Sequence, residues 1–533
     1  MDERILFYAG SFFKIDGVTL TLRGLISHIV VCGGRVLILT ADDPANESIE
    51  TFIDSYPADS VSVLRATGGL VPAPGSDYYM GLHLGKATKR ALQDYNPTVV
   101  HITNPDLVAL WLINWVQRER ANTVLMATLH TNFIDLASYY CVAGRAQALW
   151  ATSAFLRHVY SLCPAVYAPT EFMRSRLEEE QWDTKLGVWG RGVDPDLFSP
   201  ARRRQDVRRH VFGVDSNDLA VLWLGRVVQE KQPGVWLKAL KVVQAEAQER
   251  YDVAVASGAE VLPGKIVGVC IGQGEAMDML KGAEGVVCVG WKAGEELART
   301  VASCDVMVAP SEIETFGRVT LEAMSCGLAC VVNRECGSHL VKDNVNGFSV
   351  ASADLEGYVV GLRKLVENHE LRTKMSAKGR DLALGYSTSE VYNGMLEIYR
   401  SSREEQSGAF RDRKTCNKDK RSWSFWEAFG LVIYYFFELA KLLTALIALA
   451  TKGPDSEVVR LSVKAFRKHL RLLGGLLGFN SFHSGGVGGG VTVVKGGTTE
   501  VLGQRSVLIV VTALVAVIVA ATIIVGGAAA KVI

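Results

Sequence analysis

The sequence predicts an α/β protein: two domains built on parallel sheets, followed by a region that anchors the chain to a membrane. Apolar, strand-length runs alternate twice with amphipathic, helix-length segments over roughly residues 4–400. An arginine-rich stretch at 200–209 lies between the two series, and an uncharged run fills residues 507–530. Alternation of this kind is typical of parallel sheets with helices on both faces.

Each series supplies its own set of expected strands. The first set lies at 5–8, 36–40, 98–102 and 123–129, with an amphipathic helix at 16–31 after the first strand. The second set lies at 219–224, 266–271, 286–289, 306–309 and 329–333, and an amphipathic helix at 387–401 follows it. We therefore expect one domain over residues 1–200 and a second over residues 201–401.

Composition excludes some classes of function. The chain has 533 residues and a net charge of +1, which gives no overall attraction to nucleic acid. Its ten cysteines form no Cys-x-x-Cys pair, and no histidine cluster has metal-ligand spacing. We interpret them as reduced, mostly buried residues, including Cys304, Cys326 and Cys330. The first residues do not resemble a targeting signal, so we expect the catalytic part to stay in the cytosol.

Two carboxylates, Glu314 and Glu322, are separated by seven residues. They follow the expected strand at 306–309, with Phe316 and Gly317 between them. A strand, a tight turn and a helix start form the place where doubly wound sheets bind phosphates and sugars. Glu314 in the turn can accept hydrogen bonds from sugar hydroxyls, and Glu322, about two turns into the helix, can chelate a ribose diol. The alternative is two ordinary acids favoured by the helix dipole.

Further candidates follow other strands. Gly225, Arg226 and Lys231 come after the strand at 219–224, where the two cations can stabilise a leaving diphosphate; the alternative is a solvated pair at a helix start. Gly17 follows the first strand. Its N–H group can approach a phosphate, or the residue can simply be part of a turn. His130 ends the strand at 123–129 and can bind a sugar hydroxyl, orient an acceptor, or be structural.

These segments together resemble the retaining glycosyltransferases of the GT-B type, which have two facing Rossmann-like domains and a Glu-x7-Glu motif. The segment 189–200, with Trp189-Gly190-Arg191-Gly192-Val193-Asp194, is similar to the family's interdomain segment, and Leu129-His130-Thr131 to its His-Thr motif. Residues 186–194, His130 to Phe133 and Tyr139-Tyr140 are similar to the subgroup that makes sulfoquinovosyl-, mannosyl- or glucosyl-diacylglycerol. The resemblance covers roughly residues 4–400.

The resemblance implies transfer of a sugar from a nucleoside diphosphate to a hydroxyl with retention, the donor phosphate acting as base. It implies a last helix that crosses back to the first domain. It also implies that no cofactor is needed, and Asp42-Asp43 is not a convincing metal motif, so we expect no metal. The expected catalytic residues are His130, Arg226, Lys231 and Glu314. The expected donor-binding residues are Gly17, Arg226, Lys231, Glu314, Phe316, Gly317 and Glu322.

Two residues depart from the family pattern, and one of them, Gln273 in place of an acid, affects no catalytic expectation. Arg318 stands inside the Glu-x7-Glu motif, where relatives usually carry an aliphatic residue. It can contact an anionic group on the donor, but a surface or salt-bridged arginine is the simpler interpretation.

The C-terminal region predicts attachment to a membrane. Residues 402–505 form a basic linker containing a strongly apolar helix at 425–450, which can lie in the membrane surface, span it, or pack on the catalytic part. Residues 506–530 are expected to form a transmembrane helix, since 507–530 would extend about 36 Å. Basic residues before the span place the catalytic part in the cytosol, on an endomembrane or organelle envelope. We expect 404–421 to be mobile and the glycine-rich 481–499 to be a flexible linker.

The leading hypothesis is thus a membrane-anchored hexosyltransferase with a nucleotide sugar as donor and a membrane lipid, diacylglycerol above all, as acceptor. Three alternatives remain: the same reaction on a polyprenol-linked or other glycan, a sugar-nucleotide epimerase of the same fold, and a non-catalytic membrane scaffold. The donor sugar, the base and the oligomeric state are left open by the sequence.

Overall fold

The computed structural model describes residues 3–13, 17–41, 48–66, 68–72, 79–120, 122–135, 145–257 and 264–412, together with three short strands between 482 and 502. The chain divides into two compact units, which we describe separately. The larger unit comprises residues 1–73, 77–139 and 156–416 and contains two parallel sheets. The smaller comprises residues 74–76, 140–155 and 417–533.

The first sheet has seven strands in the order β3-β2-β1-β6-β7-β8-β9, and every neighbouring pair is parallel. The strands are β1 (Arg4–Tyr8), β2 (Arg35–Thr40), β3 (Val61–Arg65), β6 (Val99–Ile102), β7 (Val124–Thr128), β8 (Ala165–Ala168) and β9 (Lys185–Val188). All four strands expected in this half are present, whereas β3, β8 and β9 were not expected. The order reverses between β1 and β6, which makes that the switch point of the sheet.

Helices connect these strands. They are α1 (Gly17–Val31), α2 (Ile49–Asp54), α3 (Lys86–Tyr95), α4 (Leu107–Glu119), α6 (Arg145–Ser161) and α7 (Glu171–Glu179); the hairpin β4 (Gly68–Pro72) and β5 (Tyr79–His83) precedes α3. Asp106 caps α4 by accepting a hydrogen bond from the Ala109 N–H at 3.0 Å, and it also accepts a hydrogen bond from the Tyr8 hydroxyl. This carboxylate therefore joins the end of β1 to the start of α4.

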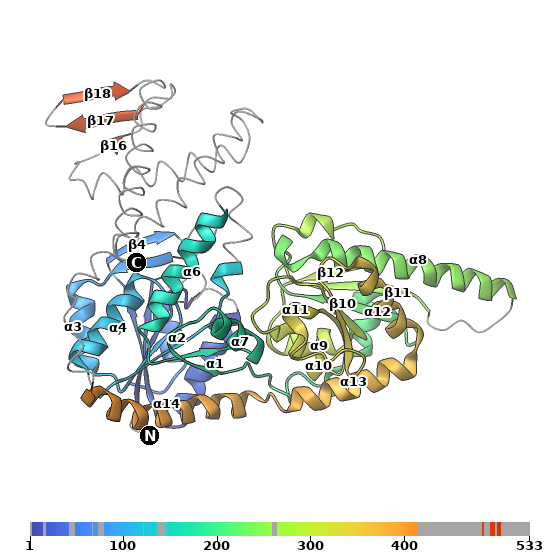
Figure 1. The fold of residues 1–533 in the computed structure, drawn as a ribbon. Coiled ribbons are helices and arrows are strands. Elements are labelled where there is room, and N and C mark those ends of the chain that lie inside the picture. Colours follow the sequence, from blue (N-terminus) through green and yellow to red (C-terminus); the bar gives the residue numbers. More distant parts are fainter. Residues whose placement is uncertain are drawn as a thin grey trace. The chain divides into compact units, whose positions relative to one another are not determined.

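The second sheet has six parallel strands in the order β12-β11-β10-β13-β14-β15. They are β10 (Leu219–Leu224), β11 (Ile266–Ile271), β12 (Val286–Gly290), β13 (Val306–Ala309), β14 (Ala329–Asn333) and β15 (Gly347–Val350). The five strands expected from the sequence are confirmed. This is the doubly wound order, with its switch point between β10 and β13. The strands β10, β11 and β12 of this sheet are labelled in Figure 1.

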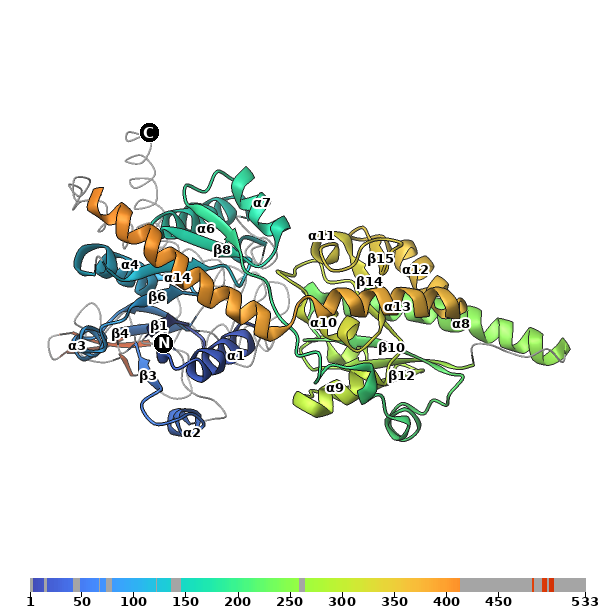
Figure 2. The same cartoon turned by 90° about the horizontal axis from the view of Figure 1, so that it is seen from below.

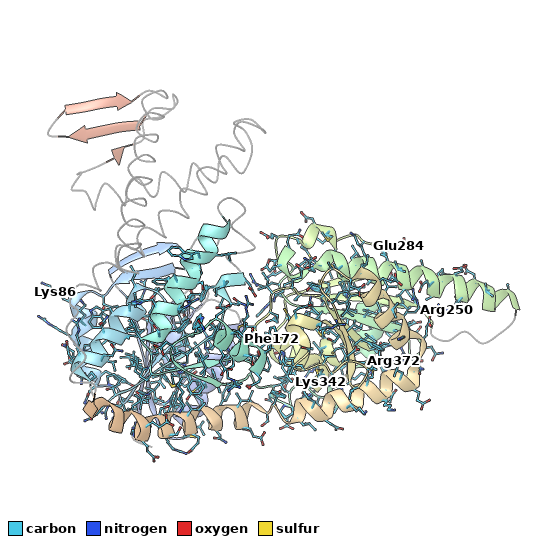
Figure 3. The ribbon with its side chains drawn as sticks, viewed as in Figure 1. Lys86, Phe172, Arg250, Glu284, Lys342 and Arg372 are labelled. Carbon is cyan, nitrogen blue, oxygen red and sulfur yellow. The ribbon has the colours of Figure 1, made fainter. Side chains whose placement is uncertain are left out.

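The helices of the second sheet are α8 (Pro233–Ser257), α9 (Gly294–Ala302), α10 (Arg318–Ser325), α11 (Arg334–Gly337), α12 (Leu355–Glu367) and α13 (His369–Leu384). Side chains of α8 and α12, among them Trp236 and Tyr358, form a core on one face. Two ion pairs join the same helices: Arg363 with Glu246 at 2.6 Å, and Arg250 with Glu367 at 2.7 Å (Arg250 is labelled in Figure 3).

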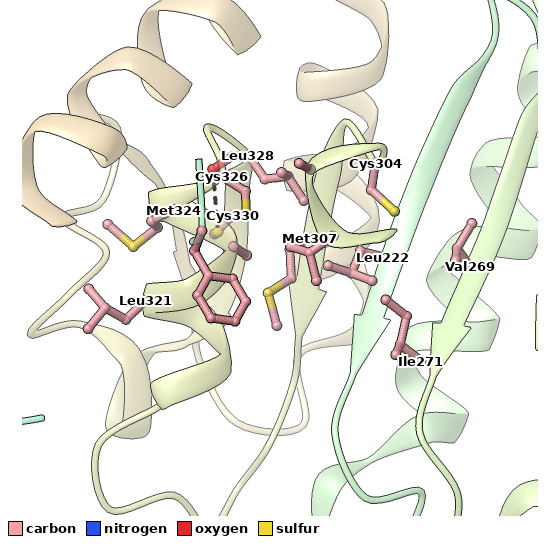
Figure 4. Packing of buried hydrophobic residues seen from close by; sticks show 14 of the residues in the cluster. Leu222, Val269, Ile271, Cys304, Met307, Leu321, Met324, Cys326, Leu328 and Cys330 are labelled. Carbon is pink, nitrogen blue, oxygen red and sulfur yellow. Dashed lines mark hydrogen bonds between the residues drawn. The ribbon is translucent and has the colours of Figure 1, made fainter. Parts of the chain in front are cut away.

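The opposite face of this sheet supports α10. Leu222 of β10 and Met307 of β13 pack in one cluster with Leu321 and Met324 of α10 (Figure 4). Cys304, Cys326 and Cys330 belong to this cluster and are free thiols, which confirms the packing role expected for them. Burial raises the pKa of the Cys326 and Cys330 thiols to about 12. The turn that precedes α10 therefore rests on a close-packed core.

The arginine-rich stretch at 200–209 is packed on the second sheet. Arg208 is only 1% exposed and donates to the Ser303 carbonyl at 2.8 Å and to the Asp305 carboxylate at 2.9 Å. Arg203 reaches the other oxygen of Asp305 at 2.6 Å. Because Asp305 directly precedes β13, the two arginines fasten this stretch to the strand that leads to Glu314.

Helix α14 (Thr388–Asp412) packs against the first sheet (Figure 2), as the resemblance implied. The Trp189 indole N–H donates to the Val391 carbonyl at 3.0 Å, and Gln406 bonds both backbone groups of Leu125 in β7. The helix continues past 401, so the expectation of a mobile segment was wrong for residues 404–412. The β7–β8 pairing covers only the last two residues of β7, Ala127 and Thr128, which leaves the Leu125 backbone available to Gln406.

The described residues near the C-terminus form an antiparallel sheet of β16 (Phe482–His483), β17 (Val491–Lys495) and β18 (Thr498–Leu502). The flexible linker expected at 481–499 was therefore wrong for these residues, because the β-branched run in β17 favours a strand. The helices expected at 425–450 and 506–530 lie outside the described residues. Within the described part, no helix combines the length and apolarity that crossing a membrane requires.

Candidate functional site

The predicted donor residues lie at the switch point of the second sheet. Arg226 and Lys231 follow β10, and Glu314 follows β13, its neighbour in the sheet. Strands that are adjacent at a switch point diverge into separate loops at their carboxyl ends and leave a crevice between them. Gly225 has φ +141°, a conformation that other residues rarely adopt, and it turns the chain from β10 toward Arg226.

Lys231 and Glu314 form an ion pair with 2.7 Å between Nζ and Oε2. Nζ also donates to the Ile313 carbonyl at 2.9 Å, and the Thr315 N–H donates to the other carboxylate oxygen of Glu314 at 3.2 Å. Burial raises the pKa of Glu314, but Lys231 and the N–H groups of Gly317 and Thr315 outweigh it, so the pKa lies below its ordinary value. Glu314 is therefore an anion held beside a cation at neutral pH.

Arg226 is the more accessible cation. Its side chain is 63% exposed, and one nitrogen lies 3.3 Å from the buried carboxylate of Glu230. Glu230 belongs to the short 3₁₀ turn at Gln229–Lys231, which also positions Lys231. One guanidinium nitrogen of Arg226 is held by Glu230, and the rest of this exposed group can therefore reach a phosphate.

The turn before α10 is shaped by Phe316 and Gly317. Gly317 has φ +82° and precedes the first residue of the helix. The Phe316 ring packs against the rings of His339 and Tyr386, with centroids 5.1 and 6.0 Å away. Glu314, Gly317, Thr320, Asn333 and Cys336 are among the residues that line a small recess beside this turn.

Glu322 lies about one turn into α10, nearer its start than the two turns we expected. It is 6% exposed, and Arg318 donates to its carboxylate at 3.0 Å. Arg318 is thus salt-bridged, in line with the simpler interpretation of this residue. Burial raises the pKa of Glu322 and Arg318 lowers it, with the net result above the ordinary value.

Gly17 is the first residue of the 15-residue helix α1, beside the switch point of the first sheet. It is exposed, and no atom lies within 4 Å of the place a Cβ would occupy. Because Gly17 has no side chain to cover its N–H group, an anion can approach the start of this helix. The phosphate contact of Gly17 remains a prediction.

His130 is 5% exposed, and both of its ring nitrogens have partners. Nδ1 lies 3.1 Å from an Arg191 nitrogen, and Nε2 lies 2.7 Å from the Thr128 hydroxyl. Burial, then the charge of Arg191 and then His101, lowers the pKa of His130 well below its usual range. In this conformation the ring is neutral and offers no free donor to a substrate.

The His130 backbone connects the two halves of the site. Its carbonyl accepts a hydrogen bond from the Thr315 hydroxyl at 3.0 Å, and Thr315 is the residue after Glu314. The structure therefore brings His130 together with the Glu314 turn through the main chain. Thr315, Arg191, Thr128, His101 and Tyr399 were missed as site residues. Two of them lay in motifs of the sequence: Arg191 is in the segment 189–200, and Thr315 lies between Glu314 and Glu322.

Comparison with known proteins agrees with this geometry. A family model described as Glycosyltransferase Family 4 matches residues 15–197, and one described as Glycosyl transferases group 1 matches residues 205–382. The chain is a glycosyltransferase, and its second half is similar to the group 1 enzymes. This confirms the enzyme class expected from the sequence.

Two of the relatives cover most of the two-sheet part of this glycosyltransferase, and a third covers about half of it. A GDP-mannose-dependent alpha-mannosyltransferase of Mycobacterium tuberculosis is 29% identical over 75% of this chain and 97% of its own. The sulfoquinovosyl transferase SQD2 of Arabidopsis thaliana is 25% identical over 69% of this chain and 68% of its own. An Escherichia coli galactosyltransferase named for a diphosphoundecaprenol-linked acceptor is 23% identical over 40% of this chain and 54% of its own.

Solved structures show that the glycosyltransferase has the GT-B fold. The sucrose-phosphate synthase of Thermosynechococcus elongatus matches with a TM-score of 0.59 at 17% identity, over 75% of this chain and 99% of its own. HepE of Anabaena, solved with UDP and glucose, matches with a TM-score of 0.54 at 18% identity, over 75% of this chain and all of its own. At these identities the likeness concerns the fold alone.

Proposed function

We propose that this glycosyltransferase moves a hexosyl group from a nucleoside diphosphate sugar to the hydroxyl of a membrane lipid, diacylglycerol above all, with retention at the anomeric carbon. The observation that carries the proposal is the ion pair between Lys231 and Glu314 at the switch point of the second sheet, 2.7 Å across. A cation and a carboxylate side by side suit a donor that is anionic at its phosphates and rich in hydroxyls at its sugar.

The proposed steps assign one task to each side chain. The bond between the anomeric carbon and the phosphate oxygen breaks, and Arg226 and Lys231 stabilise the negative charge that the diphosphate gains. Glu314 accepts hydrogen bonds from sugar hydroxyls, and Glu322 chelates the ribose. The acceptor oxygen bonds to the anomeric carbon on the same face, and its proton passes to the departing phosphate. Glu314 is engaged by Lys231 and is not assigned the nucleophile's role that a carboxylate takes in retaining hydrolases.

His130 is assigned a supporting role. Both ring nitrogens are engaged within the protein, and the ring is neutral, so it is suited to shape the acceptor side of the site rather than to accept a proton. The cations Arg226 and Lys231 supply the positive charge that a metal ion supplies in other transferases, and on that ground we propose that no metal is needed.

The acceptor is proposed from the relatives and from the sequence of the C-terminal region. SQD2 is named as a sulfoquinovosyl transferase and the Escherichia coli relative for an undecaprenol-linked acceptor. An uncharged run at 507–530 is suited to hold the enzyme at a membrane, where a lipid acceptor is found. We propose a cytosol-facing catalytic part anchored near the C-terminus.

The test is a transfer assay with the full-length protein in membranes. A panel of labelled nucleotide sugars is supplied with diacylglycerol, and the lipid fraction is separated and analysed. We expect one donor to label diacylglycerol, and the linkage to keep the anomeric configuration of the donor. A Lys231→Ala preparation serves as the control for background transfer.

Other outcomes would overturn parts of the proposal. Label in a polyprenol-linked or soluble glycan would show that the acceptor is that glycan and not diacylglycerol. A product with inverted configuration at the anomeric carbon would show that the enzyme is not a retaining transferase. An epimerised donor with no glycoside formed would indicate an epimerase, and no turnover of any donor would favour a scaffold.

A further inference from the structure

A path of hydrogen bonds crosses the interior of the first sheet from His130 to α14. The His130 Nε2 lies 2.7 Å from the Thr128 hydroxyl, which lies 2.8 Å from Nε2 of His101. The Nδ1 of His101 lies 2.7 Å from the hydroxyl of Tyr399 in α14. His101 and Thr128 are fully buried, and Tyr399 is 2% exposed. A polar path at this depth is costly unless its members are paired, and here each has a partner.

Arg191 fixes the first part of this path. It is 6% exposed, donates to the Trp189 and Gly190 carbonyls at 3.1 and 3.2 Å, and lies over the Trp189 ring at 5.1 Å. Among the described residues it has no carboxylate within ion-pair distance. A guanidinium can only donate, so Nδ1 of His130 must accept. The proton of the neutral ring is therefore on Nε2, directed at Thr128.

The other end of the path lies on the helix that returns from the second sheet. Tyr399 packs in the same core as Trp189, Tyr392 and Met395, so α14 and the segment at 189–200 share one cluster. These two segments are the connections between the sheets. The path thus runs from the segment at 189–200, through the end of β7, to α14.

We propose that Arg191, Thr128, His101 and Tyr399 are positioning residues: their hydrogen bonds hold the His130 ring in one tautomer and one orientation, and with it the carbonyl that receives Thr315 of the Glu314 turn. The inference rests on the proposed function for its catalytic consequence. Its structural part concerns the tautomer of His130 and stands independently of the substrate.

Two charged or titratable side chains act on the His130 ring: Arg191, from the segment at 189–200, and His101, from β6. Tyr399 and Arg318 lie one step further, beside His101 and Arg191 respectively. Arg191→Gln keeps an amide donor for Nδ1 but removes the positive charge. Because that charge disfavours the imidazolium, its loss raises the pKa of His130, and protonation then occurs at a higher pH than in the wild type.

The direct test is a histidine-selective ¹⁵N NMR measurement on the full-length protein, with His130→Gln used to assign the resonance. We expect a neutral ring protonated at Nε2 that does not titrate between about pH 6 and 8. In Arg191→Gln the ring should begin to titrate at a higher pH. A wild-type ring that titrates near its ordinary pKa, or carries its proton on Nδ1, would overturn the proposal whatever the enzyme's substrate.

The catalytic test separates positioning from folding. Tyr399→Phe removes one oxygen, and we expect kcat with the donor found by the panel to fall about fivefold, while UDP or GDP binds as in the wild type. Tyr95→Phe is the matched control, because its hydroxyl also bonds internal carbonyls, those of Ile5 and Arg35, away from the site. Equal kcat in Tyr399→Phe and Tyr95→Phe would overturn the positioning role. If the NMR result held but no donor was turned over, the proposed glycosyl transfer would be wrong, and the positioning of the His130 ring by this hydrogen-bonded path would still stand.

Discussion

The two sheets have the same strand order around their switch points, yet their ends carry opposite kinds of chemistry. At the second sheet, Arg226 and Lys231 are charged groups with at least partial access to solvent, and Glu314 is an anion beside them. At the first sheet, His130 is neutral, buried and hydrogen-bonded on both sides. The difference shows that one topology can carry a charged, ion-paired cluster at one sheet and a neutral, hydrogen-bonded cluster at the other, depending on which residues follow the strands.

The largest effect is expected from breaking the charged half. Lys231→Ala removes the cation proposed to face the leaving phosphate, and it leaves the partly buried Glu314 without its ion-pair partner. We expect kcat to fall on the order of a hundredfold to a thousandfold, measured by the transfer assay. Lys185→Ala is the matched control, because Lys185 pairs with Glu405 at 2.6 Å but both side chains are more than half exposed. Comparable losses in the two variants would remove Lys231 from the site.

A smaller, pH-dependent effect is expected from Arg318→Leu. Arg318 holds the pKa of the buried Glu322 down, so its removal raises that pKa further. Glu322 is then neutral below the raised pKa and no longer chelates the ribose as an anion. Affinity for UDP or GDP should therefore weaken as pH falls and recover as pH rises.

Calorimetry between about pH 5.5 and 8.5, with wild type as the reference for titration of the phosphates, measures this dependence. Wild-type affinity for Arg318→Leu at every pH would show that Glu322 does not bind the ribose as a carboxylate.

An effect on stability rather than chemistry is expected at the end of α14. A protein ending at 401 loses Gln406, whose side chain bonds both backbone groups of Leu125, and Glu405, which pairs with Lys185. We expect it to unfold at a lower temperature than a protein ending at 412, by a few degrees for a loss of about 1–2 kcal/mol. Identical unfolding temperatures by scanning calorimetry would mean that residues 402–412 do not stabilise the first sheet.

The smallest effect is expected from chelators. If Arg226 and Lys231 provide the positive charge, EDTA should leave the transfer rate unchanged within error. A rate abolished by EDTA and restored by magnesium or manganese would assign that charge to a metal ion instead.

The charged cluster at the second sheet was predictable because its residues lie in two short segments that each follow an apolar strand. The runs at 219–224 and 306–309 identified β10 and β13, and the residues after them identified Arg226, Lys231 and Glu314. Strands such as β9, which is partly exposed and only four residues long, gave no comparable signal. Burial and charge state also required the structure, as for the ion pair between Arg318 and Glu322.

The neutral half could not be predicted from local patterns. His101 and Tyr399 are 298 positions apart in the sequence, and they meet only because α14 returns to the first sheet. His130 itself was found from its place at the end of a strand. Its tautomer depends on Arg191, 61 positions away, and on the fact that a guanidinium cannot accept a hydrogen bond.

If the donor binds at Lys231 and Glu314 as proposed, their ion pair makes donor binding an exchange of partners. Without a ligand, each charge is neutralised by the other at 2.7 Å. In the proposed site, a bare nucleoside diphosphate recruits Lys231 but leaves the partly buried Glu314 carboxylate with only backbone donors, whereas the intact nucleotide sugar also offers hydroxyls to Glu314. The enzyme should therefore favour the complete donor over its own nucleotide product, and product release should be assisted by the return of Lys231 to Glu314.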